Sequence, residues 1–311
     1  MSHNPEDHQD HHHDHANHGH GHGHGHPSHN HMHGPGAQHR GYHGHHPSLE
    51  KLEAADKYAA ANRTHFNASA AHYDSQPHII EVTSGIVEAI LRTVEFDEEK
   101  TSVMEFACGT GTVESDYCLI VTDDIPGLVS QGLAPFSKVI VGVDISESMV
   151  EHYNLRVSNQ GISFDEMKAV CTELKGTDDE LDGMKFDVIV VSDLSELYGL
   201  DRLSNLPSKC SQAYHHFSSI KETTRILTSF LKPGTGVLLV IDLVKGKNTL
   251  HTSPHASEHV RDTVAHRGGF NTDEIRDVFE LCGLQGVEVE PAFTYQEKFE
   301  LFIAKGVRPA A

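Results

Sequence analysis

The sequence has few basic residues and no long hydrophobic run. Its 311 residues include 24 Lys and Arg against 45 Asp and Glu, which gives a formal net charge of −21 at pH 7. Phosphate backbones repel such an excess of negative charge, so we expect no nucleic acid among the partners. The longest apolar run, residues 236–241, is far shorter than the about 20 residues that cross a bilayer. We therefore expect no membrane partner either.

Cysteine is also sparse, with five residues, an odd number. They are Cys108, Cys118, Cys171, Cys210 and Cys282. None forms a paired zinc spacing, and the scatter is typical of free thiols in a reducing compartment. The N-terminus lacks both the basic-then-apolar layout of a secretion signal and the Arg-rich layout of a transit peptide. We therefore expect a cytoplasmic protein.

The hydrophobic share of 37% is low because residues 1–47 are almost entirely His, Gly, Asp, Asn and Pro. This tail cannot bury enough apolar surface to offset the entropy of ordering, so we expect it to be disordered. Within it, histidines alternate with glycine at His18, His20, His22, His24 and His26. Neutral imidazoles on a flexible chain bind Zn, Ni and Cu(II), which predicts a divalent-metal site without fixed geometry. The alternative is a solvated tail whose metal affinity is incidental.

The rest of the chain divides into a helical extension or cap, residues 48–98, and a main domain, residues 99–311. Helical periodicity predicts helices over residues 48–61 and 79–94 in the extension. Strands and helices then alternate, which favours a parallel sheet covered on both faces. The predicted strands are 102–106, 138–143, 167–171, 186–191 and 236–242. The predicted helices between and after them are 128–135, 146–157, 218–231 and 271–282. Residues 286–290 and 298–304 predict an antiparallel hairpin at the sheet edge.

A glycine loop and an acidic residue follow two of these strands. The segment EFACGTG, from Glu105 to Gly111, ends the first strand, and its small residues let the backbone approach a ligand. Asp144 closes the second strand, and Ser146 can cap the next helix. In doubly wound sheets, ligands lie at the carboxyl ends of the strands. A carboxylate there can accept two ribose hydroxyls, which predicts a nucleotide-like ligand.

Three ordered motifs resemble those of class I S-adenosylmethionine-dependent methyltransferases: residues 105–111, 142–149 and 231–242. Residues 72–75 and 213–217 are similar to the small-molecule branch of that family. The resemblance runs from Phe66 to the C-terminus. It implies a doubly wound, Rossmann-like, seven-stranded α/β fold with an antiparallel C-terminal hairpin. It also implies S-adenosyl-L-methionine as the methyl donor and a small-molecule substrate as acceptor.

The resemblance assigns roles to the residues around the glycine loop. Glu105 would meet the methionine amino group of the donor through water. The backbone of Ala107, Gly109 and Gly111 would pass close to the donor. Ala107 stands where the family usually has its first glycine, and one methyl group is tolerable there. Asp144 would hold the ribose.

The resemblance also assigns residues to the adenine end and to a cover. Ile145 would pack on adenine with Met149 nearby, although core packing is an equally good interpretation of both. Glu173, after the third strand, would meet the adenine amine. Tyr73 would close over the donor, or else would only pack a helix.

His215 and His216 follow the fourth strand, where the family places groups near the transferred methyl. Either could accept a proton from an acceptor hydroxyl or amine. The alternative is that paired histidines at this junction are only structural.

Two segments interrupt the family pattern, residues 112–127 behind the glycine loop and residues 191–209 behind the fourth strand. Their positions suggest retained introns in a conceptual translation; the alternative is genuine surface insertions, which loops tolerate. The first segment separates the glycine loop from a helix N-terminus that would favour the donor's carboxylate. We therefore expect the chain as written to bind donor poorly, and a version lacking both segments to bind well.

Two other functions remain open. The chain could act as a divalent-metal-binding protein through its His-rich tail, with the domain as a scaffold. It could also be an NAD-type oxidoreductase on the same architecture. The sequence disfavours the NAD-type oxidoreductase, because the dinucleotide fingerprint needs G-x-G-x-x-G and Glu114 occupies the third glycine position.

Overall fold

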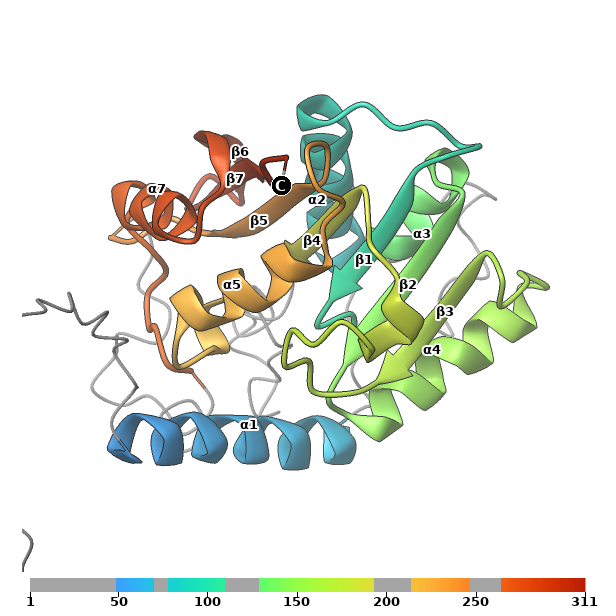
Figure 1. Ribbon diagram of the computed structural model, residues 1–311, viewed down its shortest axis with the longest axis horizontal. Coiled ribbons are helices and arrows are strands. Elements are labelled where there is room, and N and C mark those ends of the chain that lie inside the picture. The colour runs from blue at the N-terminus through green and yellow to red at the C-terminus, as the bar shows by residue number, and fades with distance from the viewer. Residues whose placement is uncertain (1–48, 70–77, 110–128, 193–213, 247–263, 311) are drawn as a thin grey trace, which may run out of the picture. The chain divides into compact units, whose positions relative to one another are not determined.

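The computed structural model describes residues 49–69, 78–109, 129–192, 214–246 and 264–310, all within the compact unit Pro47–Ala311. These residues form one seven-stranded sheet of order β3-β2-β1-β4-β5-β7-β6 (Figure 1). Its strands are β1 (Ser102–Phe106), β2 (Val139–Asp144), β3 (Met167–Cys171), β4 (Val188–Ser192), β5 (Val237–Leu243), β6 (Gln285–Tyr295) and β7 (Phe299–Val307).

Strands β1 to β5 are parallel, and β7 returns antiparallel between β5 and β6. The chain order reverses between β1 and β4, which are hydrogen-bonded neighbours. In the register, Glu105 of β1 lies beside Gly142 of β2. The carboxyl ends of β1, β2 and β4 therefore meet at one edge, beside the topological switch point. The predicted Rossmann-like sheet with an antiparallel C-terminal hairpin is confirmed.

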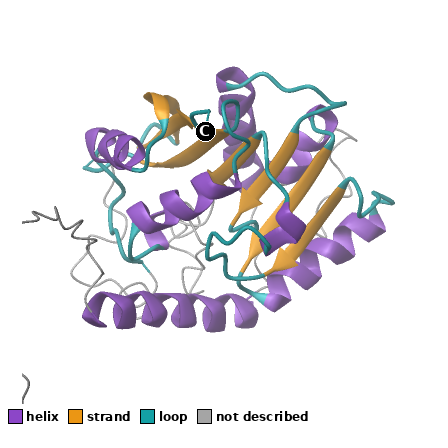
Figure 2. Cartoon of the chain, viewed as in Figure 1, coloured by secondary structure: helices purple, strands orange, loops and turns teal. Residues whose placement is uncertain are grey.

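The central strands are apolar on both sides because helices cover both faces. Along β1, for example, Val103 belongs to one core cluster and Met104 to the other. The first core is covered by α2 (His78–Thr93), α3 (Val129–Leu133) and α4 (Glu147–Asn159). The second is covered by α5 (Ile220–Phe230) and α7 (Thr272–Leu281). Figure 2 shows α5 in front of the strands.

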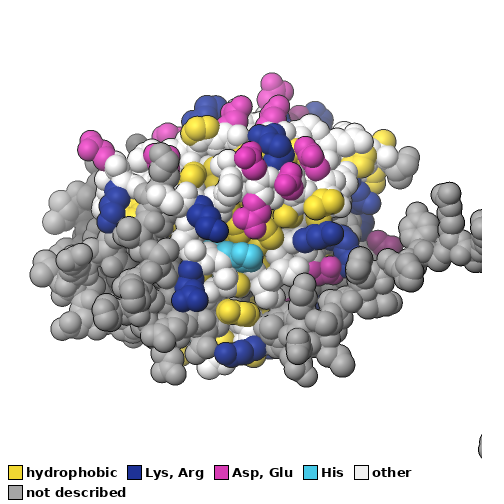
Figure 3. All heavy atoms as spheres, turned by 90° about the vertical axis from the view of Figure 1, so that its left-hand side faces the viewer, with side chains coloured by type: hydrophobic (Ala, Val, Ile, Leu, Met, Phe, Trp, Pro, Cys, Tyr) yellow, Lys and Arg dark blue, Asp and Glu magenta, His cyan; other side chains and the backbone are white. Residues whose placement is uncertain are grey.

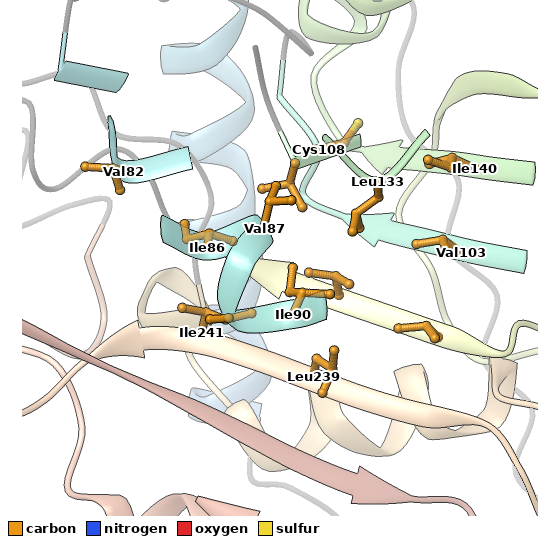
Figure 4. Close-up of a cluster of buried hydrophobic side chains, with 14 of the residues drawn as sticks. Val82, Ile86, Val87, Ile90, Val103, Cys108, Leu133, Ile140, Leu239 and Ile241 are labelled. Atoms are coloured by element: carbon orange, nitrogen blue, oxygen red, sulfur yellow. The ribbon is translucent and has the colours of Figure 1, made fainter. Parts of the chain in front are cut away.

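Helix α2 supplies most of the apolar stripe on the first face. Val82, Ile86 and Ile90 recur at helical spacing and belong to the same core cluster as strand residues, and Figure 4 shows Ile86 and Ile90 next to the strands. Gly132 of α3 lets the two helices approach, because a Cβ there would lie 2.5 Å from a methyl of Val87. The close contact packs α3 against α2.

The helices begin where the sequence provides caps. Ser146 accepts from the backbone N–H of Met149 at the start of α4, with a distance of 3.2 Å. Ser219 and Asn271 cap α5 and α7 in the same way. None of the described helices is both long and apolar enough to span a bilayer.

Most predicted bounds agree with the structure within two or three residues, and the exceptions have physical causes. Helix α1 (Leu49–Ser69) continues past the predicted end at residue 61, because it is held by contacts with α4. Strand β6 continues past residue 290 to Tyr295 through pairing with β7. Val191 and Ser192, predicted to begin the second insertion, lie in β4 and pair with β5. Residues 112–127 and 193–209, the rest of the two predicted insertions, fall outside the described residues.

Asp187 joins three segments at the amino edge of the sheet. Its Oδ2 accepts from the backbone N–H and the hydroxyl of Ser102, at 2.8 and 2.7 Å, and from Lys232 Nζ at 2.7 Å. Burial alone would raise the pKa of Asp187, but the hydrogen bonds from Lys232 and Ser102 outweigh it and lower the pKa. The ionised carboxylate therefore stabilises the folded chain.

We expect Asp187→Asn to lower the free energy of unfolding by roughly 1–3 kcal/mol, since the hydrogen bonds from Ser102 and Lys232 lose the negative charge of their acceptor. The pKa is depressed in the fold, so the contribution is present above the ordinary aspartate pKa and is lost as pH falls through the folded value. Denaturant unfolding at several pH values measures this. If the free energies of unfolding of the parent chain and Asp187→Asn differ by the same amount at neutral and at strongly acidic pH, the prediction is contradicted.

Candidate functional site at the carboxyl edge of the sheet

Asp144 connects the glycine loop to helix α4. Its Oδ2 accepts from the backbone N–H of Gly109 at 3.0 Å, and its Oδ1 accepts from the backbone N–H of Ser146 at 2.9 Å. The side chain is buried, and burial raises the pKa of Asp144 to about 6 despite these hydrogen bonds. The end of β2 thus presents a fixed carboxylate beside the loop.

The glycine loop turns sharply directly after β1. Ala107 and Gly109 both have positive φ, 63° and 59°, in the left-handed region where glycine is favoured. The backbone N–H of Ala107 donates to Val143 O at 2.7 Å, which anchors the turn on β2. A Cβ on Gly142 would lie 2.7 Å from the sulfur of Cys108, so this glycine lets the loop lie close to the strand. Gly111 lies outside the described residues.

Glu105 is the second buried carboxylate at this edge. Its Oε2 accepts from the backbone N–H of Ser130 at 3.1 Å and from the Ser130 hydroxyl. Burial raises the pKa of Glu105 to about 7, although the Ser130 hydrogen bonds favour the ionised form. Because the ordinary value is 4.5, this group costs the folded chain stability as pH rises between these two values. A bound cation would remove that cost.

Helix α3 therefore begins at the site even though residues 112–127 precede it. Its second residue, Ser130, contacts Glu105, and Gly109 contacts Asp144. Both flanks of the first predicted insertion thus lie at the same end of β1. Nothing in the sequence indicates the role of Ser130, because Ser130 meets Glu105 only when α3 packs at the end of β1.

The residues predicted for the adenine end have different surroundings. Ile145 is half-buried directly after Asp144, whereas Met149 is fully buried in the first core cluster. Glu173 lies beyond β3 and forms ion pairs with Lys175 at 2.7 Å and Arg63 at 3.5 Å. The predicted roles of these three residues toward a donor stay predictions. Tyr73 lies outside the described residues.

Helix α1 supplies two contacts that sequence reasoning missed. Asn67 Oδ1 accepts from the Ser146 hydroxyl at 2.8 Å, and Arg63 Nε donates to Ile145 O at 3.3 Å. Figure 1 shows α1 running along the edge at which β1 to β3 end. The helix thus closes the side of the site that lies next to Asp144.

The two predicted histidines lie in the 3-10 helix η6 (Tyr214–His216), and both are buried. His215 Nδ1 lies 3.0 and 3.1 Å from the two carboxylate oxygens of Asp242, near the end of β5. The ring of His216 lies 4.6 Å from the ring of His215, measured between centroids. Asp242 stood in one of the predicted family motifs, but nothing in the sequence pointed to its pairing with His215.

An aromatic contact joins the histidine segment to the glycine loop. Phe217, directly after His216, packs on Phe106 at the end of β1 with ring centroids 5.5 Å apart. The same edge of the sheet therefore carries Glu105 and Asp144 on one side of this contact and the His215–Asp242 pair on the other.

No group of three metal-ligand side chains is found within the described ranges. His18, His20, His22, His24 and His26 precede the first described residue, so metal binding by the tail stays a prediction.

Known proteins resemble this chain in sequence and in fold. No family model matches the sequence. An uncharacterised methyltransferase of Schizosaccharomyces pombe is 34% identical over 191 residues, which are 60% of this chain and 55% of the relative. The chain thus spans about half the length of that relative.

Solved structures share the fold at low identity. The [4+2]-cyclase SpnF has a TM-score of 0.51 at 12% identity, covering 84% of this chain and 97% of its own. A chain from the complex between the Haloferax volcanii Trm112 methyltransferase activator and its methyltransferase partner has a TM-score of 0.50 at 16% identity, covering 78% and 97%. The chain is thus similar in sequence to the Schizosaccharomyces pombe methyltransferase and shares the fold of these solved structures.

Proposed function

We propose that this chain transfers a methyl group from S-adenosylmethionine to a small-molecule acceptor. The observation that carries the proposal is the pair of buried carboxylates, Glu105 and Asp144, on either side of the turn at Ala107 and Gly109. Fold alone would be a weak argument, since SpnF has this fold and is a cyclase. The chemistry of the site is therefore the stronger support.

The residues fit the donor at both of its polar ends. Asp144 can accept ribose hydroxyls, which are strong donors to a carboxylate. Glu105, buried with a pKa of about 7, gains a partner when a cationic amino group arrives. The donor itself supplies an electrophilic methyl group on a sulfonium, so the protein mainly has to orient the reactants and exclude water.

A small molecule fits the surface charge better than a nucleic acid does. Acidic side chains gather in the upper part of the face in Figure 3, where basic ones are interspersed rather than continuous. Helix α7 on that side exposes four acids, Asp273, Glu274, Asp277 and Glu280. With the net charge of −21, such a surface disfavours a polyanionic substrate.

Calorimetry with S-adenosylhomocysteine tests the donor site, with NAD as the competing ligand. We expect the full chain to bind S-adenosylhomocysteine, although weakly because of residues 112–127, and not to bind NAD. Asp144→Ala should weaken binding by roughly 1–3 kcal/mol, because the ribose loses a charged acceptor. Asp165→Ala is the matched control, since Asp165 is exposed just before β3, at the opposite edge of the sheet. Unchanged affinity in Asp144→Ala would overturn the ribose assignment.

Binding should also release protons near neutral pH. A cationic amino group beside Glu105 lowers its pKa from about 7, so the carboxyl loses its proton when the ligand binds. Titrations at pH 6.5 in two buffers of different ionisation enthalpy should give different apparent heats. Glu105→Gln should abolish the difference. Equal heats in both buffers for the parent chain would contradict the placement of the amino group.

Removing residues 112–127 should preserve the fold, because Gly109 and Ser130 both lie at the carboxyl end of β1. We expect the shortened chain to bind S-adenosylhomocysteine more tightly than the full chain, since α3 then follows the loop directly. Calorimetry on both proteins, after circular dichroism shows equal structure, measures the effect. Tighter binding by the full chain would exclude the idea that the segment is a foreign insertion.

A further inference from the structure

A tyrosine of α4 lies close to the Glu105 carboxylate, within the first core. Tyr153 is 1% exposed, and so is Ser130 of α3, while Glu105 of β1 is 6% exposed. The surroundings of Tyr153 are the apolar residues of the first core cluster. Buried polar groups are rarely kept there without partners, because each has lost its hydrogen bonds to water.

The packing of α3 beside α4 brings Tyr153 to Ser130. Gln131, the residue after Ser130, borders the same small hollow as Tyr153. Burial is the largest influence on the pKa of Tyr153 and raises it well above the ordinary value, the nearby Glu105 raises it further, and a hydrogen bond with Ser130 lowers it. The phenol therefore keeps its proton and can serve as a donor.

The hydrogen bonds around Ser130 leave one position open. The Ser130 hydroxyl donates its proton to Glu105 Oε2, and the backbone N–H of Ser130 donates to the same oxygen at 3.1 Å. A hydroxyl that has given its proton can still accept through its lone pairs. The Tyr153 hydroxyl is buried and makes no hydrogen bond of ordinary geometry within the residues that the structure describes. It is therefore the donor available to the Ser130 oxygen.

We propose that Tyr153 and Ser130 are the residues that position Glu105: the Tyr153 hydroxyl donates to Ser130, and the Ser130 hydroxyl donates to the carboxylate. This inference rests on the proposed function, in which Glu105 receives a cationic amino group. A small side-chain shift completes the chain of hydrogen bonds. Tyr153 does not touch the donor and acts on it through Glu105.

The chain of hydroxyls matters because hydrogen bonds, rather than an opposite charge, favour the Glu105 carboxylate. Burial raises the pKa of Glu105 to about 7, the Ser130 hydrogen bonds lower it, and Asp144 of β2 raises it. Cys108 of the glycine loop and Tyr153 of α4 are the other titratable groups nearby, and burial keeps both neutral. Among the described groups that shift the pKa of Glu105, none is basic.

The same chain of hydrogen bonds can run in either direction. With Glu105 ionised, the protons point from Tyr153 through Ser130 to the carboxylate. With Glu105 protonated, the carboxyl donates to Ser130, and Ser130 donates to Tyr153. Hydrogen bonds to a charged acceptor are stronger than those between neutral groups, so the ionised form gains more from the chain. Removing either hydroxyl should therefore raise the pKa of Glu105.

Core packing alone would not require the Tyr153 hydroxyl. A phenylalanine would fill nearly the same space without a buried polar atom to satisfy. The two interpretations therefore differ in what they predict for Tyr153→Phe. Packing alone predicts that the pKa of Glu105 stays the same, whereas positioning through Ser130 predicts that it rises.

Calorimetry with S-adenosylhomocysteine on the full chain between pH 6 and pH 8.5 tests the effect on binding. We expect the affinity of the parent chain to rise as Glu105 ionises. At pH 6, Tyr153→Phe should weaken binding about threefold and Ser130→Ala about tenfold, because the Glu105 midpoint moves up by roughly half a unit and one unit. At pH 8.5 both differences should fall below about twofold, since the carboxyl is then mostly ionised in every variant.

Tyr295→Phe is the matched control for the loss of a phenol. Tyr295 is also a buried tyrosine, but it lies on β6, at the far edge of the sheet from β1 and β2. The control should reproduce the dependence of affinity on pH that the parent chain shows. If Tyr153→Phe loses the same factor of affinity at every pH, its effect is one of packing and the proposal is overturned.

Carbon-13 spectra of labelled glutamate side chains give a readout that needs no ligand. The Glu105 signal is the one that is absent from Glu105→Gln. We expect its titration midpoint to move upward in Tyr153→Phe and further upward in Ser130→Ala. A midpoint that stays the same or moves downward in Tyr153→Phe overturns the proposal. If the midpoint moves upward but the parent chain does not bind S-adenosylhomocysteine, the proposed function fails and the positioning of Glu105 stands.

Discussion

The carboxylate of Asp144 is the point on which the carboxyl edge of β2 depends. It receives the backbone N–H of Gly109 from the loop and that of Ser146 from the start of α4. Ser146 in turn donates to Asn67 of α1. One side chain at the end of β2 thus connects a turn, a helix and the N-terminal extension. Its burial is tolerable only because these donors surround it.

The two buried carboxylates make the folded state at this edge electrostatically costly. Burial raises the pKa of both Glu105 and Asp144, so the ligand-free fold holds charges that would gain from new partners. Such strain is typical of functional sites, where stability is exchanged for binding. In the ligand-free fold, Ser130 at the start of α3 hydrogen-bonds Glu105 and holds its side chain in place.

The polar residues at this edge come from both sides of the switch point. Glu105 and Asp144 come from β1 and β2, on one side of the switch point, whereas Asp242 comes from β5, on the other. The ring contact between Phe106 and Phe217 joins the two sides. Because parallel strands end at a common edge, residues more than a hundred positions apart can meet there without any local sequence signal.

The strands, the helices and the fold class could be predicted from the sequence, because apolar periodicity and helix caps are local features. Where the prediction stopped short, at α1 and β6, contacts with distant elements extend the element beyond its own pattern. The glycine loop and Asp144 could also be identified, since each directly follows a strand. Only the tertiary structure shows Ser130 on Glu105, Asn67 on Ser146 and Asp242 on His215. Those pairings depend on how strands far apart in the chain are ordered in the sheet, and no short-range pattern encodes that order.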